Sequence, residues 1–175
     1  HGVESHIVDA LESGGYHSVM IDASHDPFEK NIMRTKNIVQ RAVPKGVFVE
    51  AELGVLSGIE DDLSIEDHEA KFTDPQQAFE FVQKTGCNSL AVAIGTSHGA
   101  YKFSGKQRLR LDLLKAIQKL LPNYPLVLHG GSAVDTAEIK RINQYGGQLG
   151  NDASGVPESD IREAISLGIC KINIA

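Results

Sequence analysis

The sequence contains no tryptophan, only two cysteines and no cluster of basic residues. The net charge of −6 and the scattered Lys and Arg argue against nucleic acid as a partner. No apolar run approaches the roughly 20 residues that span a bilayer, and no signal peptide is recognisable, so we expect no membrane association. Cys87 and Cys170 form neither a disulfide framework nor a paired metal motif. A reduced, cytoplasmic setting is therefore expected.

The 175 residues are 41% hydrophobic, which is enough to bury the core of one domain. The chain begins at His1 and ends in the apolar run 171–175. A natural domain seldom begins and ends inside strong structural patterns. We therefore expect residues 1–175 to be a fragment of one domain.

Short apolar segments alternate with segments of helical periodicity. Buried strands are expected at 17–21, 47–53, 89–94, 126–128 and 170–174. Amphipathic helices are expected at 3–11, 27–45, 75–85, 111–121, 139–145 and 157–167. Asp26 and Glu29 predict a capping box for the second helix, and Asp74-Pro75 predicts the start of the third. Residues 57–72, which are acidic, and 148–155 are expected to be long loops.

This alternation predicts an α/β fold with a parallel sheet. A doubly wound open sheet, part of a (β/α)₈ barrel and another five-stranded α/β domain all fit the periodicity. The positions of the polar residues favour the barrel, in which functional groups gather where strands end. The polar residues near predicted strand ends are Asp22, Glu50, Glu52, His98, His129 and Asn173.

Three histidines share a local pattern, because His1, His98 and His129 are each followed by glycine. Three neutral imidazoles and one open position form a catalytic zinc site, in which zinc acts as a Lewis acid on a carbonyl. The spacing alone is a weak signal, since a lone histidine is more often packed or exposed. That second interpretation is given to the remaining histidines, which are His6, His17, His25 and His68.

Two further segments each allow two interpretations. The segment 129–132, His-Gly-Gly-Ser, fits a phosphate-binding nest, and it fits a strand-to-helix turn that needs glycine equally well. The acidic segment 58–62 fits a solvated surface, as most such runs are. A carboxylate in a mobile loop beside a metal could also act as a general base.

Several segments, in the same order along the chain, resemble class II fructose-bisphosphate aldolases. They are 19–25 (VMIDASH), 49–54 (VEAELG), 59–61 (IED), 93–103 (AIGTSHGAYKF), 127–132 (VLHGGS), 155–157 (GVP) and 171–174 (KINI). The resemblance spans essentially the whole chain, and the segment around His98 is highly specific.

The resemblance implies a (β/α)₈ TIM barrel of which about the third to eighth strands are present. It implies a homodimer or homotetramer that cleaves fructose 1,6-bisphosphate reversibly into dihydroxyacetone phosphate and glyceraldehyde 3-phosphate. His1, His98 and His129 would bind Zn²⁺, and Glu60 would transfer the proton at C3. The dihydroxyacetone phosphate half would be bound by Gly99, Lys102, Gly131, Ser132 and Asn173.

The resemblance also implies two subsidiary sites. Gly99 and Gly131 could place backbone carbonyls on a monovalent cation, Na⁺ or K⁺. Asp22 and Glu52 line the metal pocket in the family, where they hold an alternative metal position or orient the ligands.

The sequence departs from the family at both ends. The Asp that precedes the first zinc-binding histidine is absent here, and Ala175 stands where many members have Asp. We expect the chain alone to be catalytically incomplete. A tagatose-bisphosphate aldolase of the same superfamily and a non-catalytic metal-binding fragment remain the alternatives.

Overall fold

The computed structural model describes residues 3–55, 57–60, 63–65, 71–98, 109–132, 135–149 and 155–174, and for 57–60, 63–65, 97 and 98 it describes only the backbone. The helices are α1 (Glu4–Ser13), α2 (Phe28–Ala42), η1 (Val43–Lys45), α3 (Pro75–Thr85), α4 (Leu111–Leu120), α5 (Thr136–Gln144) and α6 (Glu158–Ser166). The strands are β1 (Ser18–Ile21), β2 (Phe48–Leu53), β3 (Ser57–Glu60), β4 (Leu63–Ile65), β5 (Ser89–Val92), β6 (Ser97–His98), β7 (Leu126–Leu128) and β8 (Ile169–Ile172).

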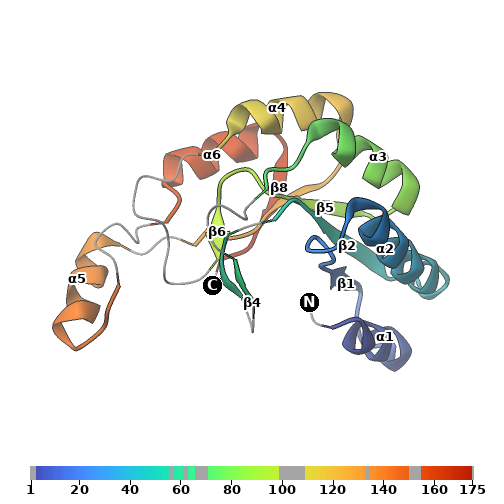
Figure 1. Cartoon of the computed structure of the whole chain (residues 1–175), viewed down its shortest axis with the longest axis horizontal. Helices are drawn as coiled ribbons and strands as arrows, with labels where there is room; N and C mark the ends of the chain where they lie inside the picture. Colours follow the sequence, from blue (N-terminus) through green and yellow to red (C-terminus); the bar gives the residue numbers. More distant parts are fainter. Residues whose placement is uncertain are drawn as a thin grey trace.

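Five strands form one parallel sheet in the order β1-β2-β5-β7-β8, as the sequence predicted. Each strand lies beside the one before it, so the order never reverses. A doubly wound sheet has a reversal, and this sheet is therefore wound in one direction, as in a barrel. Figure 1 shows α2, α3, α4 and α6 in an arc along one side of the sheet. The chain therefore forms an incomplete (β/α)₈ barrel.

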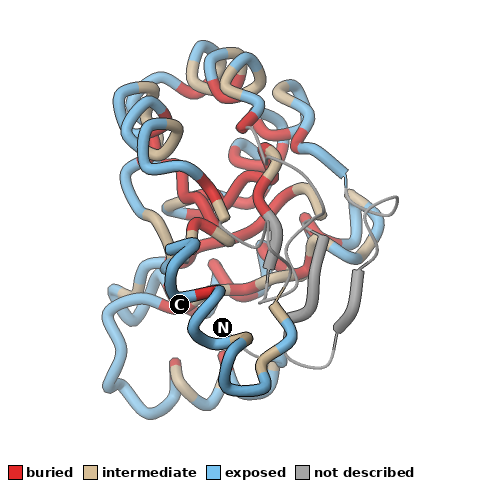
Figure 2. The backbone as a smooth tube through the Cα atoms, turned by 90° about the vertical axis from the view of Figure 1, so that its left-hand side faces the viewer, coloured by how far each residue is buried: buried red, intermediate tan, exposed pale blue. Residues whose placement is uncertain are grey.

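The convex face of the sheet carries the hydrophobic core. Parallel pairing aligns one residue from each strand in a row that faces the helices. The row consists of Ile21, Ala51, Leu90, Leu126 and Ile169, each at most 2% exposed. Phe81 of α3 is fully buried in the same core. Figure 2 shows the buried segments concentrated in the sheet and on the inner sides of the helices.

The concave face carries a different row, offset by one residue in β2, β5 and β7 and by two in β8, where the pairing with β7 shifts register. Glu52, Ala91, Val127 and Lys171 are aligned across β2, β5, β7 and β8. Because side chains alternate along a strand, Glu50 lies on this same face as Glu52. Small residues in the middle strands leave room for the longer side chains on either side.

Residues 57–72 are not a continuous loop, so that prediction was wrong. Within the described part of this segment, β3 and β4 form an antiparallel pair, and β3 also pairs in parallel with β6. Val55 and Lys71 form a further bridge at the base of the pair. Glu60 is the last residue of β3 and pairs with Leu63 of β4. It is therefore in a strand and not in a loop.

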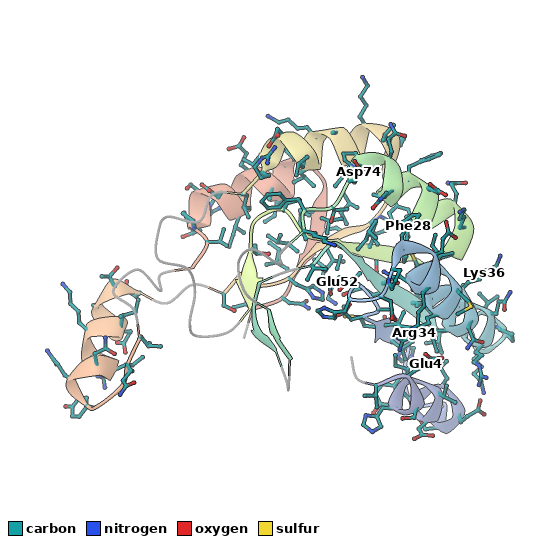
Figure 3. The ribbon with its side chains drawn as sticks, in the orientation of Figure 1. Glu4, Phe28, Arg34, Lys36, Glu52 and Asp74 are labelled. Atoms are coloured by element: carbon teal, nitrogen blue, oxygen red, sulfur yellow. The ribbon has the colours of Figure 1, made fainter. Side chains whose placement is uncertain are left out.

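The predicted capping box at Asp26 was also wrong. Pro27 is the N-cap of α2 and no side chain caps this helix. Asp26 instead contacts Lys30 at 2.7 Å and Arg34 at 2.6 Å, so its carboxylate satisfies cations rather than backbone N–H groups. Arg34 also reaches Glu4 of α1 at 3.0 Å, which ties α1 to α2 (Figure 3). At α3, Asp74 accepts from the N–H of Gln77, as predicted.

Across the described residues, no helix has the length and apolar character that crossing a membrane requires.

Candidate metal centre

His129 lies directly after β7 and points to the concave face, because it follows Val127 by two residues. Its side chain is buried, with 3% of the residue exposed. Gly130 has φ +64°, a left-handed conformation that lets the chain turn away immediately after the histidine. The glycine therefore fixes where the strand ends and leaves the imidazole at the carboxyl edge of the sheet.

Two carboxylates hold the His129 ring from opposite sides. Nε2 lies 3.0 Å from Oε1 of Glu50, and Nδ1 lies 3.3 Å from Oε2 of Glu52. Both glutamates are 4% exposed, so neither carboxylate is well hydrated. Figure 3 shows Glu52 on the concave side of the sheet. Buried carboxylates of this kind need cations, protons or a metal to offset their desolvation.

Glu50 is further held by a lysine from the opposite end of the sheet. Nζ of Lys171 donates to Oε2 of Glu50 at 2.8 Å. Burial alone would raise the pKa of Glu50, but the hydrogen bonds from His129 and Lys171 outweigh it, and the pKa lies below its ordinary value. Glu50 is therefore an ionised acceptor for both partners.

The distance between His129 and Glu52 fits that between two ligands of one metal ion. Two donor atoms on a tetrahedral zinc, each about 2.1 Å from the ion, lie roughly 3.4 Å apart. The observed separation of Nδ1 and Oε2 is 3.3 Å. Among the described side chains, no group of three His, Cys, Asp or Glu is arranged to hold a metal ion. The described residues thus provide one pair of donors at this spacing, and an imidazole and a carboxylate are donor types that zinc accepts.

The carboxyl edge beside His129 contains three of the predicted substrate residues. The N–H of Asn173 donates to the carbonyl of Leu128 at 3.0 Å, and the N–H of Gly131 donates to the carbonyl of Asn173 at 3.3 Å. These bonds place Asn173 and Gly131 next to His129. A Cβ at Gly131 would lie 2.6 Å from Cγ2 of Ile172, so only glycine allows the two strand ends to come this close. Ser132 follows, half-buried, on the same edge.

Asp22 lies at the end of β1, as predicted, but its described contacts are local. Its Oδ1 accepts from the N–H of Ser24 at 2.9 Å, and its Oδ2 lies 3.8 Å from Nε2 of His25. Its side chain is 13% exposed. Asp22 therefore shapes the turn after β1.

Five of the predicted site residues are only partly described or lie outside the described residues. His1, Gly99 and Lys102 lie outside them. His98 ends β6 and pairs with Gly58 of β3, the strand that ends at Glu60. The backbone thus brings the His98 and Glu60 segments together, while the positions of these two side chains stay predictions.

Two residues of the cluster were not among the predicted site residues, namely Glu50 and Lys171. The sequence carried a signal for each. Glu50 precedes Glu52 by two residues in a strand, and Lys171 precedes Asn173 by two, so each shares a face with a predicted site residue.

Comparison with known proteins agrees with the fold. The family model described as fructose-bisphosphate aldolase class-II matches residues 1–175. A fructose-bisphosphate aldolase from Thermus caldophilus is 50% identical over 95% of this chain and 54% of its own length. The D-tagatose-1,6-bisphosphate aldolase subunit GatY from Klebsiella oxytoca is 44% identical over 92% of this chain and 48% of its own length.

A solved structure shows the same arrangement of elements. The crystal structure of the YdjI aldolase from Escherichia coli K12 superposes with a TM-score of 0.65 at 36% identity, and the match covers all of this chain and 50% of that one. The chain spans about half the length of the relatives that it matches. The family model, in contrast, covers the chain from one end to the other. The chain belongs to the class II fructose-bisphosphate aldolase family.

Proposed function

We propose that the complete protein containing this chain is a zinc-dependent fructose-bisphosphate aldolase, which cleaves fructose 1,6-bisphosphate into dihydroxyacetone phosphate and glyceraldehyde 3-phosphate. The observation that carries the proposal is the buried pair His129–Glu52, whose donor atoms are spaced as ligands of one ion. It lies at the carboxyl edge of a barrel sheet, where the active sites of such barrels form.

Zinc would be held by His1, His98 and His129, with Glu52 as a carboxylate donor beside His129. Bound there, zinc supplies a Lewis acid for the C2 carbonyl of the sugar. Glu50 accepts a hydrogen bond from Nε2 of His129 and thereby orients the ring in the pocket. Asp22 is proposed to support the pocket from the end of β1 rather than to bind the ion.

Glu60 is proposed to carry the proton at C3 of the substrate. Its strand, β3, pairs with the strand that ends at His98, so a carboxylate at this position can approach the metal pocket. Burial of that carboxylate under bound substrate would raise its basicity toward the value that general base catalysis requires. Glu60 would thus act on the substrate and would not be a metal ligand.

The phosphate of the dihydroxyacetone half is proposed to bind at the edge formed by Gly99, Lys102, Gly131, Ser132 and Asn173. The glycines let backbone N–H groups approach an anion closely, and Lys102 adds a positive charge. The carbonyls of Gly99 and Gly131 are proposed for a monovalent cation, Na⁺ or K⁺. Gly131 is buried, and a Cβ there would lie against Ile172, so only backbone atoms of this residue could contact the ion.

The protein is proposed to work in the cytoplasm as a homodimer or homotetramer, with residues 1–175 as part of one TIM-barrel domain. The two cysteines support a reducing compartment, since among the described residues both are free thiols. No nucleic acid or membrane partner is proposed.

Chelation followed by metal replacement tests the proposal. The complete protein should lose fructose 1,6-bisphosphate cleavage after treatment with a chelator and regain it with Zn²⁺. Borohydride added with substrate should trap no adduct, because no lysine is required as a Schiff base. A stable covalent adduct, or full activity without metal, would overturn the metal mechanism.

Tagatose-bisphosphate aldolase is the second candidate, favoured by the similarity to GatY. The two substrates differ only in stereochemistry at C4. Comparison of kcat/KM for fructose 1,6-bisphosphate and tagatose 1,6-bisphosphate separates the two functions. We expect the fructose substrate to be preferred, and a preference for tagatose 1,6-bisphosphate would assign the protein to the second function.

A further inference from the structure

The bridge from Lys171 to His129 spans the concave face of the sheet. Lys171 is in β8 and Glu50 is in β2, with β5 and β7 between them. On a flat sheet these strands would be three spacings apart, roughly 14 Å. Because side chains stand roughly perpendicular to a sheet, those of Lys171 and Glu50 would not meet across that gap on a flat sheet. Their 2.8 Å contact therefore requires the curvature of the barrel, and it links strands at the two sides of the sheet.

Both oxygens of Glu50 are engaged, each by a different partner. Oε1 is 3.0 Å from Nε2 of His129 and Oε2 is 2.8 Å from Nζ of Lys171. A carboxylate that is paired with an ammonium group is only an acceptor, so the proton of His129 lies on Nε2. Nδ1, on the other side of the ring, lies 3.3 Å from Oε2 of Glu52. Lys171, through Glu50, therefore holds the imidazole ring of His129 in its orientation.

We propose that Lys171 is a positioning residue for the metal site, which fixes Glu50 and through it the orientation of the His129 ring. The printed contact of its ammonium group is with Glu50, so Lys171 is proposed to act through that carboxylate. Its own side chain is 52% exposed and borders a cavity of about 470 Å³ between α1 and the concave face. Hydrogen-bond partners behind a metal-binding histidine typically change metal affinity by about 10–100-fold.

A structural explanation of the Lys171–Glu50 pair is weaker than the positioning one. A lysine that is half exposed and paired with one carboxylate contributes little to stability. Glu50, in contrast, is buried and has His129 on its other oxygen. Loss of Lys171 would leave Glu50 free to rotate, and the ring of His129 would lose the acceptor that orients it. The effect should therefore appear at the metal and not in the folding transition.

The test compares Lys171→Met with Lys171→Arg in the complete protein, with Lys119→Met as the control. Lys119 is an exposed lysine on α4, on the helix side of the sheet. Zn²⁺ affinity is measured by competition with a chromogenic chelator on metal-free protein. The visible spectrum of the Co²⁺-substituted protein reports the geometry around the metal independently of activity.

We expect Lys171→Met to weaken Zn²⁺ binding by about 10–100-fold and to change the Co²⁺ spectrum. Lys171→Arg should keep most of the Zn²⁺ affinity and of the wild-type Co²⁺ spectrum, because it keeps the positive charge and a hydrogen-bond donor. Lys119→Met should match the wild type in both measurements. Wild-type affinity and spectrum in Lys171→Met, or no recovery in Lys171→Arg, would overturn the proposal.

A double-variant cycle keeps the proposal testable if one variant folds poorly. Glu50→Gln should also weaken Zn²⁺ binding, and adding Lys171→Met to it should cost little more, because both act through one bridge. Additive losses would overturn the proposal. The inference rests on the proposed zinc function, but the two fail differently. A wild-type protein that binds no zinc refutes the function, whereas a zinc-binding wild type with an unaffected Lys171→Met refutes only the role of Lys171.

Discussion

The two faces of the sheet use the same strands for different purposes. On the convex face, the aligned row from Ile21 to Ile169 is apolar and fully packed under the helices. On the concave face, the neighbouring row begins with Glu52 and ends with Lys171. The convex face stabilises the fold by burying apolar area, about 1.5–3 kcal/mol for each large side chain. The concave face buries charge, which lowers stability unless each group is paired.

The difference teaches that the buried charged residues of the concave face form a paired cluster and are not a defect of packing. Glu50, Glu52 and His129 are as buried as the core, yet each has a polar partner in the cluster. Substitutions on the convex face should therefore change stability, and substitutions on the concave face should change metal binding and catalysis. Each prediction below tests this separation.

The largest effect is expected on the convex face. Phe81→Ala in the complete protein should lower the free energy of unfolding by about 3–5 kcal/mol, because a fully buried ring that packs 6.3 Å from Phe28 leaves a cavity. Urea denaturation measures it. Phe79→Ala, on the exposed side of the same helix, should change stability by only about 0.5 kcal/mol. Zinc bound per folded molecule should be unchanged in both, and a parallel loss of zinc in Phe81→Ala would show that the faces are not separable.

The next effect is expected at the edge of the concave face. Glu60→Gln should lower kcat by at least about 10²-fold, the usual scale for loss of a general base. Zinc content and the melting temperature should stay near the wild-type values. Glu138→Gln, in an exposed position on α5, is the matched control and should leave kcat unchanged. Zinc lost together with activity would mean that Glu60 is a ligand or a structural residue.

An intermediate effect is expected where the two strand ends meet. Gly131→Ala should cost about 1–3 kcal/mol, since its Cβ would be forced against Ile172. It should also raise KM, because Gly131 is proposed to bind the phosphate. Gly15→Ala is the control, since a Cβ there would meet only Oγ of Ser13, at 3.9 Å. Equal behaviour of the two variants in melting and in KM would refute the close packing of β7 and β8.

The smallest effect is expected at the ion pairs outside the core. Hydrogen bonds from Lys30 and Arg34 hold the pKa of Asp26 below its ordinary value. A lowered pKa stabilises the fold above the unfolded value, near pH 4, and this stabilisation is lost as the pH falls through the folded value. Asp26→Asn should therefore lower the melting temperature at pH 7, and the difference from the wild type should shrink below about pH 4. A difference that is independent of pH would mean that the ion pairs contribute nothing.

Much of the fold follows from periodicity. The five parallel strands and the helices between them were predicted because apolar runs and helical spacing are local signals. The β3–β4 pair was missed, because its strands are only four and three residues long and lie within an acidic segment. The cap at Asp26 was mispredicted because Lys30 and Arg34 compete for the same carboxylate.

The candidate site was predicted only in part, for a physical reason. Lys171 and Glu50 are 121 residues apart, and their contact depends on the curvature of the whole sheet. No local sequence pattern indicates that two residues so far apart in the chain are in contact. His129 and Glu52 were singled out through the family resemblance, whereas their contact emerged from the alignment of strands.

The most direct test of the account is the zinc content of His129→Ala in the complete protein, measured by elemental analysis after gel filtration. His17→Ala is the control, an exposed histidine before β1. The account predicts that His129→Ala loses its tightly bound zinc, while His17→Ala keeps as much zinc per protomer as the wild type. Wild-type zinc content and affinity in His129→Ala would contradict it.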